Sequence, residues 1–183
     1  MSQYTYDASY SETRNRLTVA FRIILAIPHM IVAQIWGYLA QILAVVQWFI
    51  ALFTGKRNDG IWNMQRQWLD YDSRVLGYIG MLYDPYPAFG TDPGPVPVVT
   101  GIEPEPDANR LTVGLRLIWM IPAVILSAII GIGAFFVAIV SWFAIVITGK
   151  HPRGMWDFLH RALKYSQQVQ AYSLLMTDIY PKW

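Results

Sequence analysis

The 183-residue sequence has no cysteine and few charged residues, and both shortages limit what the protein can be. Without cysteine there is no disulfide, no zinc site with cysteine ligands and no iron–sulfur cluster. Charged residues make up 14% of the chain, against about 25% in an average soluble domain. The formal net charge of +2 is too small to indicate nucleic-acid binding. The three histidines share no ligand spacing, so we expect no metal and no cofactor.

Charge is missing above all from two 39-residue stretches, residues 17–55 and 111–149. The first contains only Arg22 and His29 as charged or imidazole side chains, and the second only Arg116. A soluble protein of this size could not bury two such stretches, so the sequence predicts an all-α membrane protein. Neither stretch contains a carboxylate, which is the usual residue of a proton relay or an ion-coupled transport path.

An internal duplication is present at an offset of 94 residues. Residues 15–87 align with residues 109–181 without a gap, and 29 of the 73 aligned positions are identical. We therefore predict two tandem repeats, 1–87 and 109–183, joined by a proline-rich connector, 88–108. Gln34, Gln41 and Gln47 have no glutamine counterpart in the second repeat, which favours helix contacts within the protein or with a partner over a symmetric pathway.

The pattern within each repeat predicts a hydrophobic segment followed by an amphipathic helix. Apolar side chains recur every three or four residues over 60–83 and 154–177, as in a helix that lies at the membrane interface. On the polar face of the first of these helices, Asp70 and Arg74 are predicted to pair. The β-prone stretches Tyr4–Tyr6 and Val98–Thr100 occupy equivalent places before each repeat and predict short strands, which can pair with each other.

Two arrangements of the hydrophobic stretches remain open. In the favoured one, each stretch is a helical hairpin that turns near Gly37, or near Gly131 and Gly133 in the second repeat. In the other, Pro28 and Pro122 divide a short interfacial helix from one long spanning helix. The hairpin is favoured because it places the basic flanks of both repeats on the cytoplasmic face, as the positive-inside rule expects.

Six cations at the ends of these stretches are the candidate site, and we expect them to bind lipid headgroups: Lys56, Arg57, Lys150, Arg153, Arg22 and Arg116. The last two lie a few residues inside the apolar stretches. Their guanidinium groups are expected to snorkel to the interface, with a packed ion pair or a headgroup contact as the alternative. The pairs Gly55-Lys56 and Gly149-Lys150 lack the earlier glycine of a phosphate-binding loop.

Three segments carry a family resemblance. They are Ala26–Val32 (AIPHMIV), Trp142–Gly154 (WFAIVITGKHPRG) and Gln170–Pro181 (QAYSLLMTDIYP). Together they resemble the domain of unknown function 4389 family, whose members are bacterial membrane proteins that often carry the domain twice. The family has no established activity, so the resemblance implies residence in a bacterial membrane and no reaction. The first repeat departs from the family pattern at Arg57-Asn58-Asp59, where the second has His-Pro-Arg.

These observations predict a non-catalytic integral membrane protein. We expect an accessory subunit or scaffold of a larger complex, whose partners are lipids and other integral membrane proteins. The alternative is a lipid-binding or membrane-shaping protein that inserts through its hairpins. The expected location is the bacterial cytoplasmic (inner) membrane, with several membrane passes and the basic flanks in the cytoplasm. No signal peptide is visible, so insertion is expected to use the first hydrophobic segment.

Overall fold

The computed structural model describes residues 3–183 and is mostly helical. The first repeat forms α1 (Arg16–Ala20), α2 (Arg22–Thr54) and α3 (Asp59–Ile79). The second repeat forms α4 (Arg110–Gly114), α5 (Arg116–Thr148) and α6 (Arg153–Ser173). Two short strands, β1 (Thr5–Ala8) and β2 (Val98–Gly101), precede α1 and α4. Every helix of the second repeat begins and ends 94 residues after its counterpart in the first, which confirms the duplication as a structural one.

The ends of the helices follow from local sequence. The side chains of Asn15 and Asn109 accept hydrogen bonds from the first free amides of α1 and α4, as an N-cap residue does. Gly55 and Gly149 end α2 and α5 with φ of 73° and 77°. Glycine adopts this left-handed conformation without the steric cost that a side chain adds, so each long helix ends at its glycine.

The predicted hairpins are wrong, because α2 and α5 are continuous helices of 33 residues each. Gly37 lies inside α2, where it allows a close approach: a Cβ at this position would be 3.1 Å from the Trp68 ring. Pro28 and Pro122 also lie inside the helices, so they do not divide them. The division between a short and a long helix falls instead at Phe21 and Leu115, which cap both elements.

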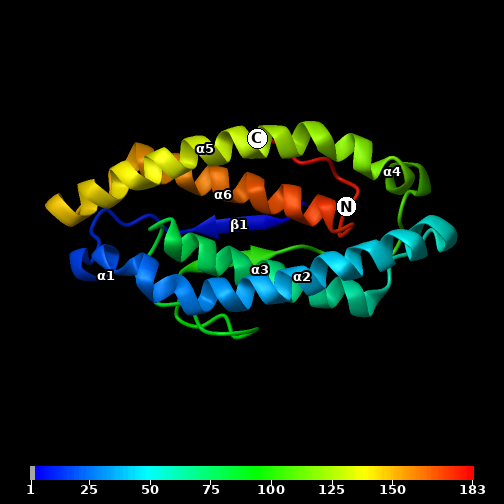
Figure 1. The fold of residues 1–183 in the computed structure, drawn as a ribbon, viewed down its shortest axis with the longest axis horizontal. Helices are drawn as coiled ribbons and strands as arrows, with labels where there is room; N and C mark the ends of the chain where they lie inside the picture. The colour runs from blue at the N-terminus through cyan, green and yellow to red at the C-terminus, as the bar shows by residue number, and fades with distance from the viewer. Residues whose placement is uncertain (1–2) are drawn as a thin grey trace.

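Four of the helices run along the long axis of the molecule (Figure 1). α2 packs on α3, α5 packs on α6, and α3 contacts α6. α2 and α5 lie along opposite edges and run in opposite directions, with α3 and α6 between them (Figure 1). The short helices are exchanged between repeats, since α1 packs on α5 and α4 packs on α2. Trp142 Nε1 donates to the Val19 carbonyl (3.0 Å) and Trp48 Nε1 to the Val113 carbonyl (2.8 Å) across these two contacts.

The predicted strand pairing is confirmed. β1 and β2 are antiparallel, with Tyr6 opposite Thr100, and the ribbon packs on α3 and α6. Tyr4 and Tyr6 point into the core, and the Tyr4 hydroxyl lies 2.9 Å from Ser73 Oγ of α3. The ribbon therefore covers a side of α3 other than the one on which α2 packs.

The two amphipathic helices end four residues earlier than predicted, at Ile79 and Ser173. Beyond these ends, Met81 and Leu175 adopt left-handed φ values of 59° and 63°. The predicted pair between Asp70 and Arg74 is also wrong. Asp70 pairs with Arg66 at 3.1 Å, while Arg74 is buried beneath the connector, where it donates to the carbonyls of Gly90 and Asp92.

Candidate functional site

A broad apolar surface runs along α2 and α5. These are the two described helices long and apolar enough to cross a membrane. In the most apolar 18-residue segment of α2, only 28% of the segment is buried, and in that of α5 only 6%. A core helix of a soluble protein would be mostly buried. Large side chains project outward from both, among them Ile42, Ile129 and Phe135, each at least 61% exposed. We call the exposed apolar side chains of α2 and α5 the apolar platform.

Small residues explain why the large ones point away from the protein. α2 meets the rest of the molecule through a narrow stripe that includes Ala26, Ala33, Gly37 and Ala40, all buried. Such a stripe lets the backbones of α2 and α3 approach closely. The bulky residues between its members are then left on the outer side of α2.

Other parts of the surface are polar. Arg161 and Lys164 are exposed near the middle of α6, and Thr5 and Asp7 are exposed on β1. The ribbon has only two strands, so one edge of each strand has no strand partner in the described chain. The molecule is therefore amphipathic as a whole, with α2 and α5 forming its apolar side.

Each repeat contains a buried arginine that joins its first long helix to the end of its amphipathic helix. Arg22, at the start of α2, donates to the carbonyls of Tyr78 and Tyr83 and pairs with Asp84 at 2.8 Å. Its guanidinium carbon lies 4.5 Å from the centre of the Tyr78 ring. The other carboxylate oxygen of Asp84 accepts from the Asn15 amide at 2.9 Å, which ties the start of α1 to the same point.

Arg116 makes the equivalent contacts in the second repeat. It donates to the carbonyls of Tyr172 and Thr177, pairs with Asp178 at 2.6 Å, and lies 4.0 Å over the Tyr172 ring. We call these two sets of contacts the arginine clamps. In each clamp, one carbonyl lies in the last turn of α3 or α6 and also accepts a backbone amide, and the other lies beyond the end of the helix. Through the two terminal nitrogens of each guanidinium, the clamps tie the start of each long helix to the end of the amphipathic helix that packs on it.

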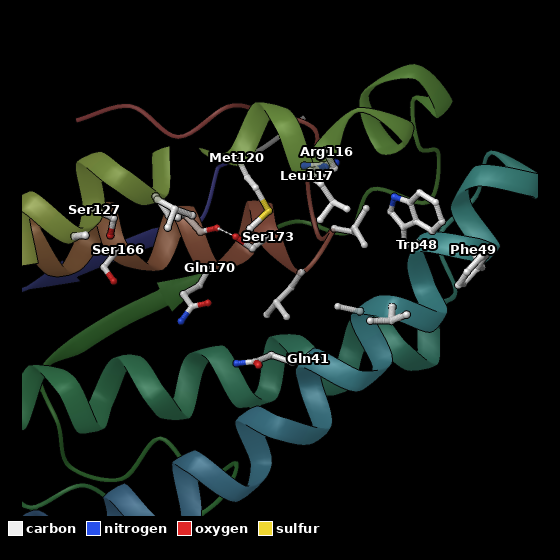
Figure 2. Close-up of a pocket in the computed structure, with 17 residues that line it drawn as sticks. Gln41, Trp48, Phe49, Arg116, Leu117, Met120, Ser127, Ser166, Gln170 and Ser173 are labelled. Atoms are coloured by element: carbon white, nitrogen blue, oxygen red, sulfur yellow. Dashed lines mark hydrogen bonds between the residues drawn. The ribbon is translucent and has the colours of Figure 1, made fainter. Parts of the chain in front are cut away.

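A cavity of about 800 Å³ lies between α2, α5 and α6. It is lined mostly by apolar side chains, with five uncharged polar ones among them: Gln41, Ser127, Ser166, Gln170 and Ser173. In Figure 2, Gln170 extends from α6 and Gln41 from α2 toward the space between these helices. Within residues 3–183, neither glutamine side chain hydrogen-bonds to another residue. The only charged lining residue in this part of the chain is Arg116, which is held by Asp178.

The two halves that contain these clamps also match a known family. A family model described as "Domain of unknown function (DUF4389)" matches residues 16–90 and residues 110–183. The chain belongs to the DUF4389 family. No curated protein and no solved structure matches the chain significantly. Each matched DUF4389 repeat contains one complete clamp, Arg22 with Asp84 or Arg116 with Asp178.

The prediction that Arg22 and Arg116 snorkel to the interface is wrong. Both are 1% exposed, so neither can bind a lipid headgroup, and the alternative of a packed ion pair is the one observed. The sequence contained the signal for this pairing. Asp84 and Asp178 are identical across the two DUF4389 repeats, at the same spacing of 62 residues from the two arginines.

The four remaining cations of the candidate site do not form one cluster. Arg57 is buried and pairs with Asp178 at 2.8 Å, so the prediction that it binds headgroups is wrong. Lys56, Lys150 and Arg153 are exposed, and their binding to lipid stays a prediction. Lys150 pairs with Glu12 at 2.9 Å and Arg153 with Asp157 at 2.9 Å, both on the surface.

The histidines of this DUF4389 protein are packed side chains. His29 Nδ1 lies 2.7 Å from the Tyr71 hydroxyl, His160 stacks on Trp156, and His151 Nδ1 lies 3.2 Å from the Met81 carbonyl. Burial, and after it the nearby charge of Arg14, lowers the pKa of His151 to about 4. Across residues 3–183 there is no group of three or more histidine, cysteine, aspartate or glutamate side chains that could hold a metal ion.

Sequence reasoning identified the glutamines of α2 but not the cavity. Gln47 accepts from the Asn58 amide within the protein (3.1 Å), while Gln34 and Gln41 are both exposed and, of these two, Gln41 lines the cavity. The polar residues Gln170 and Ser173 lie on α6, where we had considered only the apolar stripe. The signal that was missed is their replacement across the duplication by Leu76 and Ile79.

Proposed function

We propose that this DUF4389 protein is a non-catalytic membrane protein that embeds α2 and α5 in one leaflet of a bilayer and so binds and shapes that leaflet. The observation that carries the proposal is the apolar platform: two long helices, side by side with their amphipathic partners, whose large apolar side chains face outward. A soluble monomer rarely exposes a continuous apolar surface of this extent. Insertion in lipid removes that surface from water.

The geometry favours helices that lie in the plane of the membrane over helices that cross it. At 1.5 Å per residue each 33-residue helix is about 50 Å long, against a hydrocarbon core of about 30 Å. α3 and α6 run along α2 and α5, so a crossing arrangement would also take Arg161 and Lys164 into the hydrocarbon. The free edges of the β ribbon would enter it too, with amides and carbonyls that lipid cannot satisfy. With α2 and α5 in the plane, all of these groups stay in water.

This arrangement replaces the predicted multi-pass hairpins, but like them it places the exposed cations on one face of the membrane. The exposed cations Lys56, Lys150 and Arg153 still lie on one face of the membrane, now at the two ends of the apolar platform. In the bacterial cytoplasmic membrane, the positive-inside rule and the anionic inner leaflet both favour the cytoplasmic face. Two long helices in a single leaflet expand that leaflet, and for this reason we infer a membrane-shaping role.

Cysteine labelling tests the in-plane arrangement. The native chain has no cysteine, and Asp59 and Arg153 are equivalent exposed positions at the starts of α3 and α6, at opposite ends of the antiparallel pair. In sealed vesicles with one orientation, Asp59→Cys and Arg153→Cys should both react with a membrane-impermeant maleimide from the same side. Reaction from opposite sides would show that α2 and α5 cross the membrane. Tubulation of liposomes by the purified protein alone then tests the shaping role.

A scaffold for other integral membrane proteins is the second candidate, and one observation on α5 favours it. Gly131 is exposed on the outer side of α5, and a Cβ at this position would meet no atom within 4 Å. Small residues on a lipid-facing helix surface allow a second helix to approach closely. If a partner binds there, Gly131→Leu should abolish its stoichiometric co-purification from mild detergent without changing how the protein floats with liposomes. If no protein co-purifies with the native chain, the scaffold role is wrong.

A further inference from the structure

We infer that the cavity between α2, α5 and α6 binds a membrane glycerolipid by one acyl chain and the ester group of that chain, both of which are uncharged. This inference rests on the proposed function, because the lipid must reach the cavity from the leaflet in which α2 and α5 are embedded. Two walls of the cavity belong to α2 and α5 themselves, so it is continuous with the apolar platform. Its floor is α6 (Figure 2).

The size and lining of the cavity define the ligand. At roughly 30 Å³ for each non-hydrogen atom in a liquid, 800 Å³ holds on the order of 25 such atoms, about one acyl chain with its ester. Most lining side chains are apolar, among them Val124 and Leu117 of α5 and Val45 of α2. Such a lining with a few polar groups is typical of sites for small, mainly apolar ligands.

The polar residues indicate which group is recognised. Gln41 and Gln170 each present an amide that can both donate and accept, and neither is used by another described residue. Gln41 is exposed and Gln170 is half-buried, so both amides lose their water when α2 and α5 are embedded in the leaflet. An amide without a partner in lipid costs free energy, which a hydrogen-bonding ligand would recover. Because the charge of Arg116 is already met by Asp178, the lining provides no free charge for a phosphate. An ester or hydroxyl group fits these amides, while a charged headgroup would remain at the membrane surface.

The duplication shows that the fold does not require these polar side chains. At the positions related by the 94-residue offset, Gln41, Gln170 and Ser173 are replaced by Phe135, Leu76 and Ile79. The same backbone therefore accommodates large apolar side chains at all three positions. Gln41 of the first repeat lines the same cavity as Gln170 and Ser173 of the second, and their three counterparts are all apolar, as expected for a single binding site in a duplicated fold.

The triple variant Gln41→Phe, Gln170→Leu, Ser173→Ile tests the inference, because it fills the cavity with residues that the other half already carries. Gln34→Ala is the matched control, since it also takes its repeat equivalent but removes an exposed glutamine outside the cavity. Each protein is loaded from liposomes of dioleoylphosphatidylcholine, purified in mild detergent, and analysed by native mass spectrometry. We expect about one retained lipid per chain for the native protein and the control, and at least a tenfold lower occupancy for the triple variant. Gln41→Phe alone should give the same direction of change if the triple variant does not fold.

Further arms of the experiment separate the possible sources of binding. Dioleoylglycerol, which has no headgroup, should be retained as well as dioleoylphosphatidylcholine. Retention that depends on the headgroup, equal retention by the triple variant, or a stoichiometric protein in place of lipid would each overturn the inference. Liposome flotation of the same proteins tests the underlying insertion. A native protein that floats but retains no lipid overturns the lipid site alone, whereas one that does not float also overturns the proposed function.

Discussion

Arg14 and Arg57 donate to equivalent carbonyls at opposite ends of the molecule, although they hold non-equivalent places in the repeats. Arg14 Nε donates to the Met81 carbonyl at 3.1 Å, and Arg57 Nε donates to the Leu175 carbonyl at 2.6 Å. Met81 and Leu175 are related by the 94-residue offset, but the counterparts of the two arginines are Ala108 and His151. Both carbonyls belong to residues with left-handed φ, so the arginines hold two strained turns of the same kind.

Breaking a clamp should destabilise the protein strongly. Arg22→Gln leaves two backbone carbonyls and Asp84, whose side chain is 31% exposed, without their cation. Removing one partner of a fully buried ion pair costs about 3 kcal/mol or more, and the exposure of Asp84 lowers the expected loss to about 2 kcal/mol. Arg66→Gln is the control, because it breaks a partly exposed pair with Asp70 that contributes only about 0.5 kcal/mol. Denaturant unfolding in detergent, followed by circular dichroism, measures both. Similar losses for the two variants would contradict the structural role of the clamp.

Two equivalent glycines should respond to alanine in opposite directions. A Cβ at Gly37 would lie 3.1 to 3.2 Å from the Trp68 ring, which is buried and fixed by a hydrogen bond to the Ala33 carbonyl. Gly37→Ala should therefore lower the melting temperature by forcing α2 away from α3. Gly131→Ala meets no atom within 4 Å and should stabilise α5 by up to about 1 kcal/mol, the difference in helix propensity between the two residues. Differential scanning fluorimetry distinguishes the signs, and destabilisation by both variants would reject the argument.

Acidification should destabilise the protein through His151. Its pKa falls from the usual 6.5 to about 4 in the folded protein, so between these values the unfolded chain binds a proton that the folded one does not. The stability contributed by neutral His151 is full above pH 6.5 and is lost as pH falls toward 4. His151→Gln should flatten this slope. Burial raises the pKa of Asp72 to about 6 and gives the opposite slope, so the comparison to make is the difference between variant and native protein at each pH. An identical pH dependence of the two would contradict the prediction.

The exposed cations should contribute to membrane binding, and the buried one should not. Neutralising Lys56, Lys150 and Arg153 with glutamine removes three charges, each worth about 1 kcal/mol near an anionic leaflet. Binding to liposomes that contain phosphatidylglycerol should fall by roughly 100-fold at low salt, with little change for liposomes of phosphatidylcholine alone. Arg57→Gln is expected to lower the unfolding free energy instead, because its guanidinium is paired with Asp178. Unchanged affinity of the triple variant for anionic liposomes would reduce these cations to solvated surface residues.

The duplication, the two helix-ending glycines and the pairing of β1 with β2 could all be predicted from the sequence. Each depends on a local pattern or on identity at a fixed offset, and neither needs knowledge of distant contacts. Gly55 and Gly149 are an example: the residue type that tolerates positive φ stands at the end of each apolar stretch. The two arginines of the clamps were also identified, but their role was assigned incorrectly. Arg22 was expected to reach outward because a cation inside an apolar stretch is costly, and its partner, Asp84, lies 62 residues away, outside any local pattern.

Tertiary structure decided that α2 is continuous, and it decided the direction in which each arginine side chain points. Gly37 is compatible in sequence with either a turn or a helix, and the close packing of Trp68 against it selects the helix. The same holds for the cavity, whose walls come from α2 and α5 and whose floor comes from α6. Periodicity reports which face of a single helix is apolar, but the free energy that orients a helix comes from burial against others. For this protein the sequence by itself therefore determined the repeat and the glycines that end the long helices, whereas only the packing of the helices on each other decided that α2 and α5 are continuous, which arginines are buried and where the apolar platform opens into a cavity.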